Sequence, residues 1–201
     1  MTGRPYEYRI QNVVATASIG RRLDLKEITR VYQNQEYHPE VFPGLPFRLK
    51  KPRSVTLIFG AGKFICMGTK SEIDAKETVK KVLKKLEEVY KRKFRIPETI
   101  IVNIVASGDF YDIIDLEVAQ YNLPDRYKCM YEPEQFPALM ARDTKHYSLE
   151  QRGPVEKQGV FLLFNSGKFV CTGVKSEESV ELRVRDMHQA LFDTNCLFPR
   201  T

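Results

Sequence analysis

The stretch Val55–Glu72, VTLIFGAGKFICMGTKSE, is the key to the architecture because it occurs twice: VFLLFNSGKFVCTGVKSE follows at Val160–Glu177, 105 residues later. An internal repeat has to be recognised first, since missing it would misassign the whole fold. Three further blocks recur in the same order, at offsets of 91 or 94 residues. The chain therefore contains a duplicated module of about 90 residues. The matching blocks are Ile10–Thr16 with Ile101–Ser107, Leu23–Glu27 with Ile114–Val118, and Tyr37–Leu45 with Tyr131–Leu139.

The offsets between the copies also locate an insertion and the domain boundaries. They rise from 94 to 105 residues before the last block, so the second copy holds 11 extra residues. These fall within Asp143–Gln158, where Gly153-Pro154 and many polar residues predict an extended loop. Two copies are too few for an open solenoid, so we expect a closed, pseudo-twofold domain. The repeats are assigned to residues 1–95 and 96–201.

Each copy is predicted to contain a strand, a short helix, several strands and a long helix. Turn residues at Lys50–Pro52 and Gly60–Gly62 separate strand-length apolar runs, which indicates antiparallel hairpins. The long helix starts at a cap, Ser71 in the first copy and Ser176 in the second. Apolar residues then recur every three or four positions, as an amphipathic helix requires. The first-copy elements are expected at Arg9–Thr16, Asp24–Tyr32, Phe42–Leu49, Arg53–Phe59 and Lys63–Met67, and the helix stripes are Val79, Leu83, Leu86 and Tyr90, then Val180, Val184, Met187 and Leu191.

The strands of the module are apolar on both faces. Because side chains alternate along a strand, Val55, Leu57 and Phe59 share one face while Thr56 and Ile58 share the other. Short turns force antiparallel pairing, and two helices per copy can cover only one face of such a sheet. The second face is then an exposed apolar surface of the kind that marks a binding site. The alternative is a sandwich in which the two copies cover each other's free faces.

Composition narrows the class of protein. Apolar residues make up 42% and charged residues 29%, which is typical of a globular chain. No apolar run is long enough for a membrane span, and Met1–Ile10 lacks the apolar stretch of a signal peptide. The scattered cysteines argue against a zinc site and favour a reducing intracellular compartment. There is no nucleophile motif or glycine-rich phosphate loop, and His38, His146 and His188 fall at unrelated positions, so no catalytic residue, metal or cofactor is predicted.

Charge is divided unevenly along the chain. Residues 1–95 carry 21 Lys and Arg against 10 Asp and Glu, whereas residues 96–201 carry 11 against 16. A basic half suggests a polyanion as ligand, and an acidic half suggests a basic partner. The alternative is that these charges only keep the protein soluble.

Five short motifs occur at matching places in both copies. In the first copy they are Asn12–Val14, Tyr37–Phe42, Leu57–Phe59, Gly62-Lys63 and Gly68–Glu72; in the second they are Asn103–Val105, Tyr131–Phe136, Leu162–Phe164, Gly167-Lys168 and Gly173–Glu177. Together they resemble the TATA-box-binding protein family over essentially the whole chain.

This resemblance implies a fold and a function. The implied fold is α+β: two pseudo-symmetric repeats form a saddle, with one curved antiparallel sheet of about ten strands and helices on its convex face. The implied function is that of a general transcription initiation factor, not an enzyme, which binds and bends A/T-rich (TATA-box) promoter DNA through the minor groove and recruits transcription factor IIB. The alternative is a regulatory paralogue that acts mainly through protein contacts and binds DNA weakly. The expected location is the nucleus, or the cytoplasm if the source is archaeal.

The resemblance also assigns DNA contacts residue by residue. They are of four kinds: apolar contacts to base edges, polar groups for base-edge acceptors, phenylalanine wedges, and cations for phosphates. The apolar contacts are Val14, Leu57, Ile65, Val105, Leu162 and Val170; the polar groups are Asn12 and Asn103, near the pseudo-twofold axis, and Thr172; the wedges are Phe42 with Phe59 and Phe136 with Phe164, with Pro43 and Pro137 beside them; and the cations are Arg48, Lys63, Lys70, Arg142, Lys168 and Lys175.

Partner surfaces are implied in the same way. Glu132, Glu134 and Gln135 lie in a segment that resembles the family's contact with transcription factor IIB. The basic helix from Ser71 to Arg92 resembles the family's docking face for other initiation factors or regulators. The alternative is that this helix presents only a solvated charged face.

Two positions depart from the family pattern. The family threonine is present as Thr172 but is Met67 in the first copy, and the family serine is present as Ser166 but is Ala61 in the first copy. Loss of a hydroxyl at Met67 is expected to relax base preference in that half. All four wedge phenylalanines are present, so DNA binding is still expected.

Overall fold

The computed structural model describes residues 5–33, 35–144 and 159–200. Of the extended loop expected within Asp143–Gln158, residues 145–158 lie outside this described part. In the part that is described, no helix is both long enough and apolar enough to cross a membrane. Nor do those residues include a group of three or more His, Cys, Asp or Glu side chains that could hold a metal ion.

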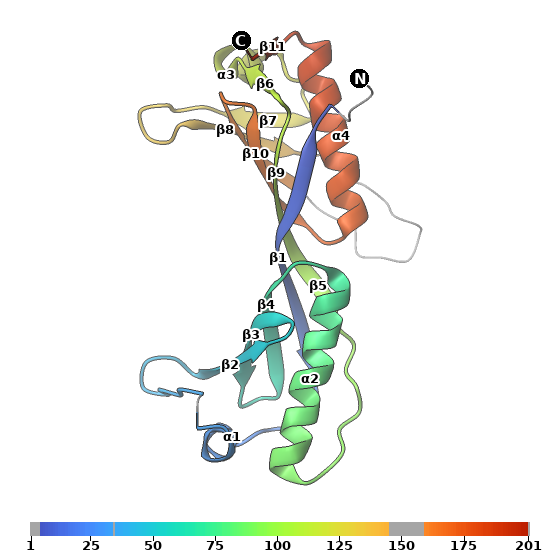
Figure 1. Cartoon of the computed structure of the whole chain (residues 1–201). Helices are drawn as coiled ribbons and strands as arrows, with labels where there is room; N and C mark the ends of the chain where they lie inside the picture. The colour runs from blue at the N-terminus through green and yellow to red at the C-terminus, as the bar shows by residue number, and fades with distance from the viewer. Residues whose placement is uncertain (1–4, 34, 145–158, 201) are drawn as a thin grey trace. The chain divides into compact units, whose positions relative to one another are not determined.

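The first half of the chain follows the predicted order of elements (Figure 1). The short helix begins after Asp24 and the long helix after Ser71, and each cap side chain accepts a backbone N–H of the first turn at 3.0 Å. The second strand starts later than the predicted run from Phe42. The chain still turns there, because the His38 carbonyl accepts the N–H groups of both Val41 and Phe42. The elements are β1 (Glu7–Ser18), α1 (Leu25–Val31), β2 (Gly44–Lys50), β3 (Arg53–Phe59), β4 (Lys63–Thr69) and α2 (Glu72–Tyr90).

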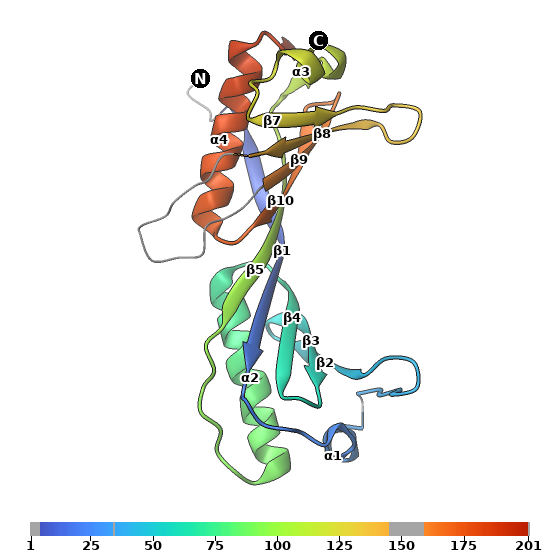
Figure 2. The same cartoon turned by 180° about the vertical axis from the view of Figure 1, so that it is seen from behind.

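The second half repeats this order with additions (Figure 2). The long helix again begins after its predicted cap, Ser176, whose hydroxyl accepts an N–H at 3.1 Å. Strand β7 pairs with β8, whereas at the aligned place in the first half the Gln35 Oε1 accepts the N–H of Arg48 at 2.9 Å. In the first half a side chain thus accepts a backbone N–H of β2, at the strand edge that corresponds to the one covered by β7 in the second half. The elements are β5 (Ile100–Asp109), β6 (Asp112–Ile114), α3 (Leu116–Asn122), β7 (Tyr127–Met130), β8 (Ala138–Asp143), β9 (Gly159–Phe164), β10 (Lys168–Val174), α4 (Glu177–Asp193) and β11 (Leu197–Pro199).

One main antiparallel sheet contains nine strands of the described chain, in the order β2-β3-β4-β1-β5-β10-β9-β8-β7. This confirms the expected single large antiparallel sheet of about ten strands, nine of which lie in the described residues. The expectation of a closed domain is wrong for the sheet, because β2 and β7 end the order and do not pair with each other. Hairpins join strands that are neighbours in the sequence. As the first and last strands of the order, β2 and β7 each have one partner. The short strands β6 and β11 form a separate sheet.

Two compact units can be distinguished. The N-terminal unit comprises Asn12–Val102, and the C-terminal unit comprises Met1–Gln11 together with Asn103–Thr201. The start of β1 therefore groups with the second copy of the repeat, although by sequence it belongs to the first. The division of the repeats at residue 95 stays a prediction from the sequence.

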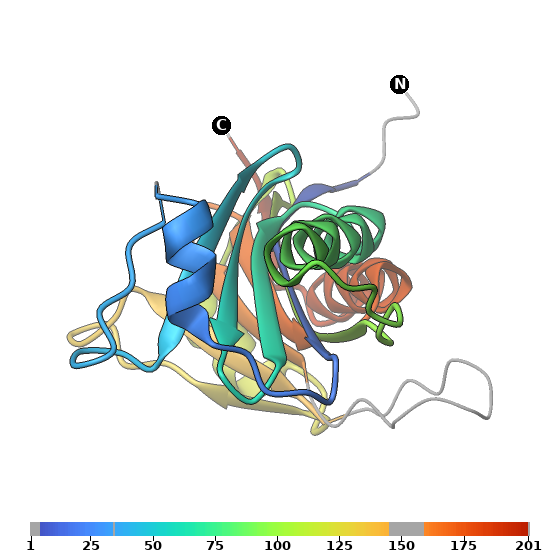
Figure 3. The same cartoon turned by 90° about the horizontal axis from the view of Figure 1, so that it is seen from below.

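In the N-terminal unit, α2 packs on β3 and β4 and forms the core with them (Figure 3). Three of the four predicted stripe residues are buried there: Val79 and Leu86 are 0% exposed and Leu83 is 3% exposed. The fourth, Tyr90, is only partly buried. Ile58 of β3 and Phe64 of β4 are fully buried in the same core. The 3.6-residue period of the sequence thus correctly identified the face of α2 that the sheet covers.

In the C-terminal unit, α4 packs on β10 in the same manner. Its whole predicted stripe has no exposed surface, and it lies in a core with aromatic side chains of β9 and β10. Val180, Val184, Met187 and Leu191 form the stripe, and Phe161 and Phe169 are the buried aromatic residues.

Strands β3, β4, β9 and β10 bury alternate side chains on the helix side and keep the others partly exposed. On β3, Thr56 and Ile58 are buried, whereas Val55, Leu57 and Phe59 keep partial exposure. The same alternation recurs on β4, β9 and β10. Side chains under a second covering layer would be buried, so this pattern argues against the sandwich alternative. We call the partly exposed side the helix-free face of each unit.

Candidate nucleic-acid interface

In the N-terminal unit, a row of side chains crosses the helix-free face from strand to strand. Opposite residues of an antiparallel pair lie on the same face and touch. Leu57 on β3 is opposite both Pro46 on β2 and Ile65 on β4. Ile65 is in turn opposite Thr16 on β1, and Val14 lies two residues before Thr16 on the same face. The predicted apolar contacts of this unit are therefore neighbours on one surface.

The C-terminal unit has the corresponding row. Leu162 on β9 is opposite both Met140 on β8 and Val170 on β10. Val170 is opposite Ser107 on β5, and Val105 lies two residues earlier on the same face. The row is apolar except for the Ser107 hydroxyl, as the first row is except for that of Thr16.

A pair of phenylalanines lies on each unit at the place expected for the wedges. The rings of Phe42 and Phe59 meet edge to face, with centroids 6.0 Å apart and planes at 67°. Those of Phe136 and Phe164 meet at 6.3 Å and 68°. Phe42 is 42% exposed and Phe136 is 47% exposed, whereas a core phenylalanine would be buried. The prolines that follow the outer rings, Pro43 and Pro137, are exposed as well.

The two predicted asparagines hold their amides in the same way. Asn12 Oδ1 accepts the N–H of Gly68 at 2.7 Å, and Asn103 Oδ1 accepts the N–H of Gly173 at 2.9 Å. A backbone N–H can only donate, so the amide oxygen is fixed on the strand and the NH₂ group points elsewhere. Among the described residues, neither NH₂ group has a hydrogen-bond acceptor. Each asparagine therefore offers donors to an acceptor on a ligand.

Each unit has a hollow lined by residues from three of the predicted classes. In the N-terminal unit a hollow of about 640 Å³ is lined by the wedge Phe59, the cation Lys63 and the apolar residue Ile65. In the C-terminal unit a hollow of about 590 Å³ is lined by the aligned residues. A side chain that can insert, one that can bind phosphate and one that can contact a base edge thus border the same space. The aligned residues are Phe164, Lys168 and Val170.

The predicted phosphate-binding cations occupy two kinds of place. Arg48 is opposite Val55, and Arg142 is opposite Val160, so both arginines emerge on the helix-free face. Lys63 and Lys168 are the first residues of β4 and β10, and both are exposed. The last two cations are lysines that lie outside the strands, because each directly precedes the cap of a long helix. These are Lys70, before Ser71, and Lys175, before Ser176.

A carboxylate that the sequence analysis missed lies beside Lys168. Lys63 is opposite Ser18, whereas Lys168 is opposite Asp109. Partial burial opposes ionisation of Asp109, but hydrogen bonds from Arg200 and from a backbone N–H hold the pKa of its carboxyl below the usual value. Asp109 therefore stays negative at neutral pH. The offset of 91 residues, which aligns Asp109 with Ser18, was the available signal.

The predicted partner segment is an exposed turn. Glu132, Glu134 and Gln135 are all exposed. The Glu132 carbonyl accepts the N–H groups of Gln135 and Phe136, each at 3.0 Å, which closes the turn directly before the outer ring of the wedge pair. The two carboxylates thus extend from a defined backbone next to Phe136.

The surface of α2 is basic but includes acidic neighbours. Lys76, Lys80 and Lys84 are exposed. Other lysines of the helix pair with its glutamates: Lys81 lies 3.5 Å from Glu77, and Lys85 lies 3.1 Å from Glu88. These are exposed ion pairs of small energetic value, so the surface remains open to a charged partner.

The chain is similar to known proteins over nearly its whole length. The family model "Transcription factor TFIID (or TATA-binding protein, TBP)" matches residues 7–89 and again residues 98–194. The TATA-box-binding protein of Pyrobaculum neutrophilum is 40% identical over 98% of this chain and 93% of its own length, and that of Archaeoglobus fulgidus is 38% identical over 92% and 95%. The solved structure of Methanococcus jannaschii TBP has a TM-score of 0.73 at 36% identity and covers 93% of this chain and 99% of its own. These relatives are archaeal, and archaeal cells have no nucleus, so they give the expected nuclear location no support.

Proposed function

The chain belongs to the TATA-binding protein family, and on that basis we propose that it binds A/T-rich duplex DNA in the minor groove with the helix-free face of each unit. Members of this family are DNA-binding transcription factors and not enzymes, and the chain has the role of a general transcription factor. The observation that carries the proposal is the duplicated face: each unit has an apolar row, a phenylalanine pair and an asparagine with its donors directed away from the strand.

The chemistry of the face matches the minor groove of A/T-rich DNA. A·T pairs show only the adenine N3 and thymine O2 acceptors there, whereas G·C pairs add a protruding amino group. Leu57 with Ile65, and Leu162 with Val170, form apolar surfaces that would be obstructed by that amino group and offer it no acceptor. The amide groups of Asn12 and Asn103 supply donors for the acceptors. The face therefore favours A·T over G·C.

The phenylalanine pairs would bend the DNA. In this family and other minor-groove proteins, apolar wedges unstack base steps at a cost of roughly a few kcal/mol per step, offset by contacts with the widened groove. Phe42 and Phe136 are the exposed members and are backed by Phe59 and Phe164, so each pair can enter a step as a unit. The exposed arginines Arg48 and Arg142 would hold the phosphates on either side, with Lys63 and Lys168.

The acidic turn at Glu132 and Glu134 would recruit a basic partner, a transcription factor IIB-like protein. Its two exposed carboxylates project from a closed turn, and opposite charges at the rim of an interface speed association. The basic surface of α2 would accept other initiation factors or regulators. Because the relatives named above are archaeal, the proposed place of action is the archaeal cytoplasm.

A binding titration tests the DNA proposal. The affinity for a TATA-like duplex should exceed that for a G/C duplex of equal length at every salt concentration, while both affinities fall as salt rises. Equal affinity for the two duplexes would overturn the proposal and favour a regulatory paralogue that acts through protein contacts.

Bending is tested by energy transfer between dyes at the two ends of the duplex. Phe164→Ala should reduce bending while changing the unfolding free energy little, because the ring is partly exposed. The control is Phe161→Ala on the other side of the same strand, which should cost about 3–5 kcal/mol of stability as a buried truncation does. A loss of that size for Phe164→Ala would identify this ring as core instead.

Charge reversal tests the partner surface. Glu132→Arg with Glu134→Arg should leave binding to naked DNA unchanged or slightly tighter, but should slow assembly of the ternary complex with a transcription factor IIB-like protein at low salt. The matched control is Glu40→Arg in the aligned turn of the N-terminal unit. Normal ternary assembly with the double variant would rule out this surface.

A further inference from the structure

The separate two-stranded sheet brings an arginine to the turn between β9 and β10. In that sheet β11 pairs with β6, and Arg200 directly follows β11. Its Nη2 donates to the carbonyl of Ser166 in the turn. The space there is tight, because a Cβ on Gly167 would lie 2.8 Å from the same Nη2. The guanidinium group is therefore held against the turn that directly precedes Lys168.

The same guanidinium group pairs with Asp109. Nη2 of Arg200 donates to Asp109 Oδ1, which also accepts the backbone N–H of Tyr111 at 2.8 Å. The side chain of Asp109 is 17% exposed and that of Arg200 is 38% exposed. A carboxylate with two such donors is stabilised in its charged form, so the contact joins one negative and one positive charge.

This pair lies at the border of the hollow in the C-terminal unit. Both acceptors of Arg200, which are Asp109 and Ser166, line that hollow together with Lys168. Asp109 is also the strand partner of Lys168, and opposite charges in such positions attract each other. Among the described residues, however, no ion pair joins Lys168 to this carboxylate, because its Oδ1 is bound by Arg200 and by a backbone N–H.

The hollow of the N-terminal unit has no corresponding carboxylate. Lys63 is opposite Ser18, whose neutral hydroxyl accepts the N–H of Gly20 at 3.3 Å. The other acidic residue of each hollow lies at an aligned place, Glu98 in the N-terminal unit and Glu7 in the C-terminal unit. Arg200 thus accompanies the one carboxylate that distinguishes the two hollows.

We propose that Arg200 is a positioning residue for DNA binding: it holds the Asp109 carboxylate and thereby leaves Lys168 free to bind a phosphate. This inference rests on the proposed binding of DNA by the helix-free faces. Without Arg200, Lys168 would pair with Asp109 across the two strands. A lysine in such a pair attracts a phosphate less, because the carboxylate beside it repels the same phosphate.

The experiment is a double-mutant cycle, with affinity measured on an A/T-rich duplex at low salt. The variants are Arg200→Gln, Lys168→Ala and the two together. Asp109→Ser combined with Arg200→Gln is the rescue. Lys63→Ala, with and without Arg200→Gln, is the matched control in the N-terminal unit. The unfolding midpoint of each variant is measured as well, so that binding is compared between folded proteins.

We expect Arg200→Gln to lower the affinity about twofold to fivefold, the range of a partly exposed charge pair. Lys168→Ala should cost less affinity in the Arg200→Gln background than in the parent protein, because Lys168 is then already paired with Asp109. Lys63→Ala should cost the same in both backgrounds. Adding Asp109→Ser to Arg200→Gln should restore the parent affinity.

Three results would overturn the inference. Arg200→Gln could leave the affinity unchanged. Lys168→Ala could cost the same in both backgrounds, which would make Arg200 an independent phosphate contact. Asp109→Ser could fail to rescue Arg200→Gln, which would give Arg200 a structural role at the turn. Failure of the proposed function itself would look different, because the parent protein would then not prefer the A/T-rich duplex over a G/C duplex at all.

Discussion

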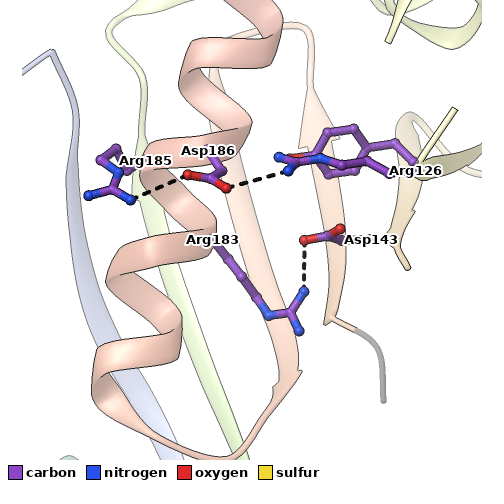
Figure 4. Close-up of polar contacts among 6 residues, drawn as sticks. Arg126, Asp143, Arg183, Arg185 and Asp186 are labelled. Carbon is purple, nitrogen blue, oxygen red and sulfur yellow. Dashed lines mark hydrogen bonds and ion pairs between the residues drawn. The ribbon is translucent and has the colours of Figure 1, made fainter. Parts of the chain in front are cut away.

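The N-terminal and C-terminal units present the same kind of helix-free face but support it with different buried chemistry. In the N-terminal unit, the hydroxyls of Ser54 and Thr78 lie 3.2 Å apart inside the core. At the aligned positions the C-terminal unit has Gly159 and Arg183. The Arg183 Nη1 lies 2.7 Å from Asp143 Oδ2, and both side chains are 0% exposed (Figure 4). The core of the N-terminal unit thus contains a pair of neutral hydroxyls, whereas the core of the C-terminal unit contains an ion pair.

The two cores differ at three aligned positions and not only at one, because the large Arg183 side chain leaves no room for a side chain at residue 159. A Cβ on Gly159 would lie 2.9 Å from Cδ and 3.0 Å from Nε of Arg183, so a serine there would collide with the guanidinium side chain. The carboxylate that meets Arg183 is the strand partner of Gly159. The residues that change together are Leu49, Ser54 and Thr78 in the N-terminal unit, and Asp143, Gly159 and Arg183 in the C-terminal unit.

The two cores show that the helix-covered face of a strand can change while its helix-free face stays the same. Side chains alternate, so the face under the helix can be repacked while the opposite face keeps its apolar row and its phenylalanine pair. Buried volume and hydrogen bonding must match within each unit, but nothing requires the same solution in both.

The largest expected effect comes from breaking the buried ion pair. Arg183→Thr, which introduces the residue of the N-terminal unit, should lower the free energy of unfolding by roughly 3–5 kcal/mol, because it leaves the Asp143 carboxylate buried without its guanidinium. Denaturant titration measures this loss.

A triple change sharpens that result. Asp143→Leu with Gly159→Ser and Arg183→Thr should recover most of the stability, since it introduces the residues of the N-terminal unit at all three positions. Thr78→Val is the control in the N-terminal unit and should cost about 1 kcal/mol, the value of one hydrogen bond. A triple variant as unstable as the single one would show that the two cores are not interchangeable.

The next effect concerns the space under the wedges. A Cβ on Gly44 would lie 2.6 Å from Phe42 and 3.0 Å from Phe59, while the aligned residue of the C-terminal unit is already an alanine, Ala138. Gly44→Ala should cost about 1–2 kcal/mol and reduce DNA bending, because the rings must move. Unfolding and end-to-end energy transfer measure the two quantities. Ala138→Gly is the reverse change and should leave bending intact; equal loss of bending in both variants would contradict this explanation.

A smaller effect is expected from the carboxylate beside Lys168. Asp109→Ser removes a negative charge from the C-terminal half and should raise DNA affinity a few-fold at low salt. Ser18→Asp should lower it by a similar factor, since it places the same charge opposite Lys63. Titrations at two salt concentrations test both changes, and effects that do not weaken at the higher salt would exclude charge as their cause.

The smallest effect is the pH dependence of stability from the same group. Because the pKa of Asp109 is lowered in the folded protein, its contribution is fully present above the unfolded value of about 3.9 and is lost as pH falls through the folded value. We expect Asp109→Ser to remove less than about 1 kcal/mol of this acid-sensitive stability, because the ion pair with Arg200 is partly exposed. Unfolding curves between pH 2 and pH 7 for both proteins measure it. A larger loss of stability in the variant at pH 2 than at pH 7 would contradict the sign.

Residues close together in the chain are enough to predict the duplicated order of elements, the helix caps at Ser71 and Ser176, and the alternation that divides Ile58 from Leu57. These features are local, so turn chemistry and side-chain periodicity act on them directly. The repeat alone also aligns the wedge phenylalanines of the two copies with each other, and likewise the two asparagines. The roles of these residues in DNA binding stay predictions.

Contacts between distant residues, in contrast, could be read only from the folded chain. The fold groups the start of β1 with the second copy, sets the order of the nine sheet strands that the structure describes, puts Asp109 opposite Lys168, and joins Asp143 to Arg183 across 40 residues of sequence. Such contacts depend on strand register and on the space between a helix and its sheet. Both are settled only when the whole core packs, because burial of a charge is tolerated only where its partner arrives at the same place.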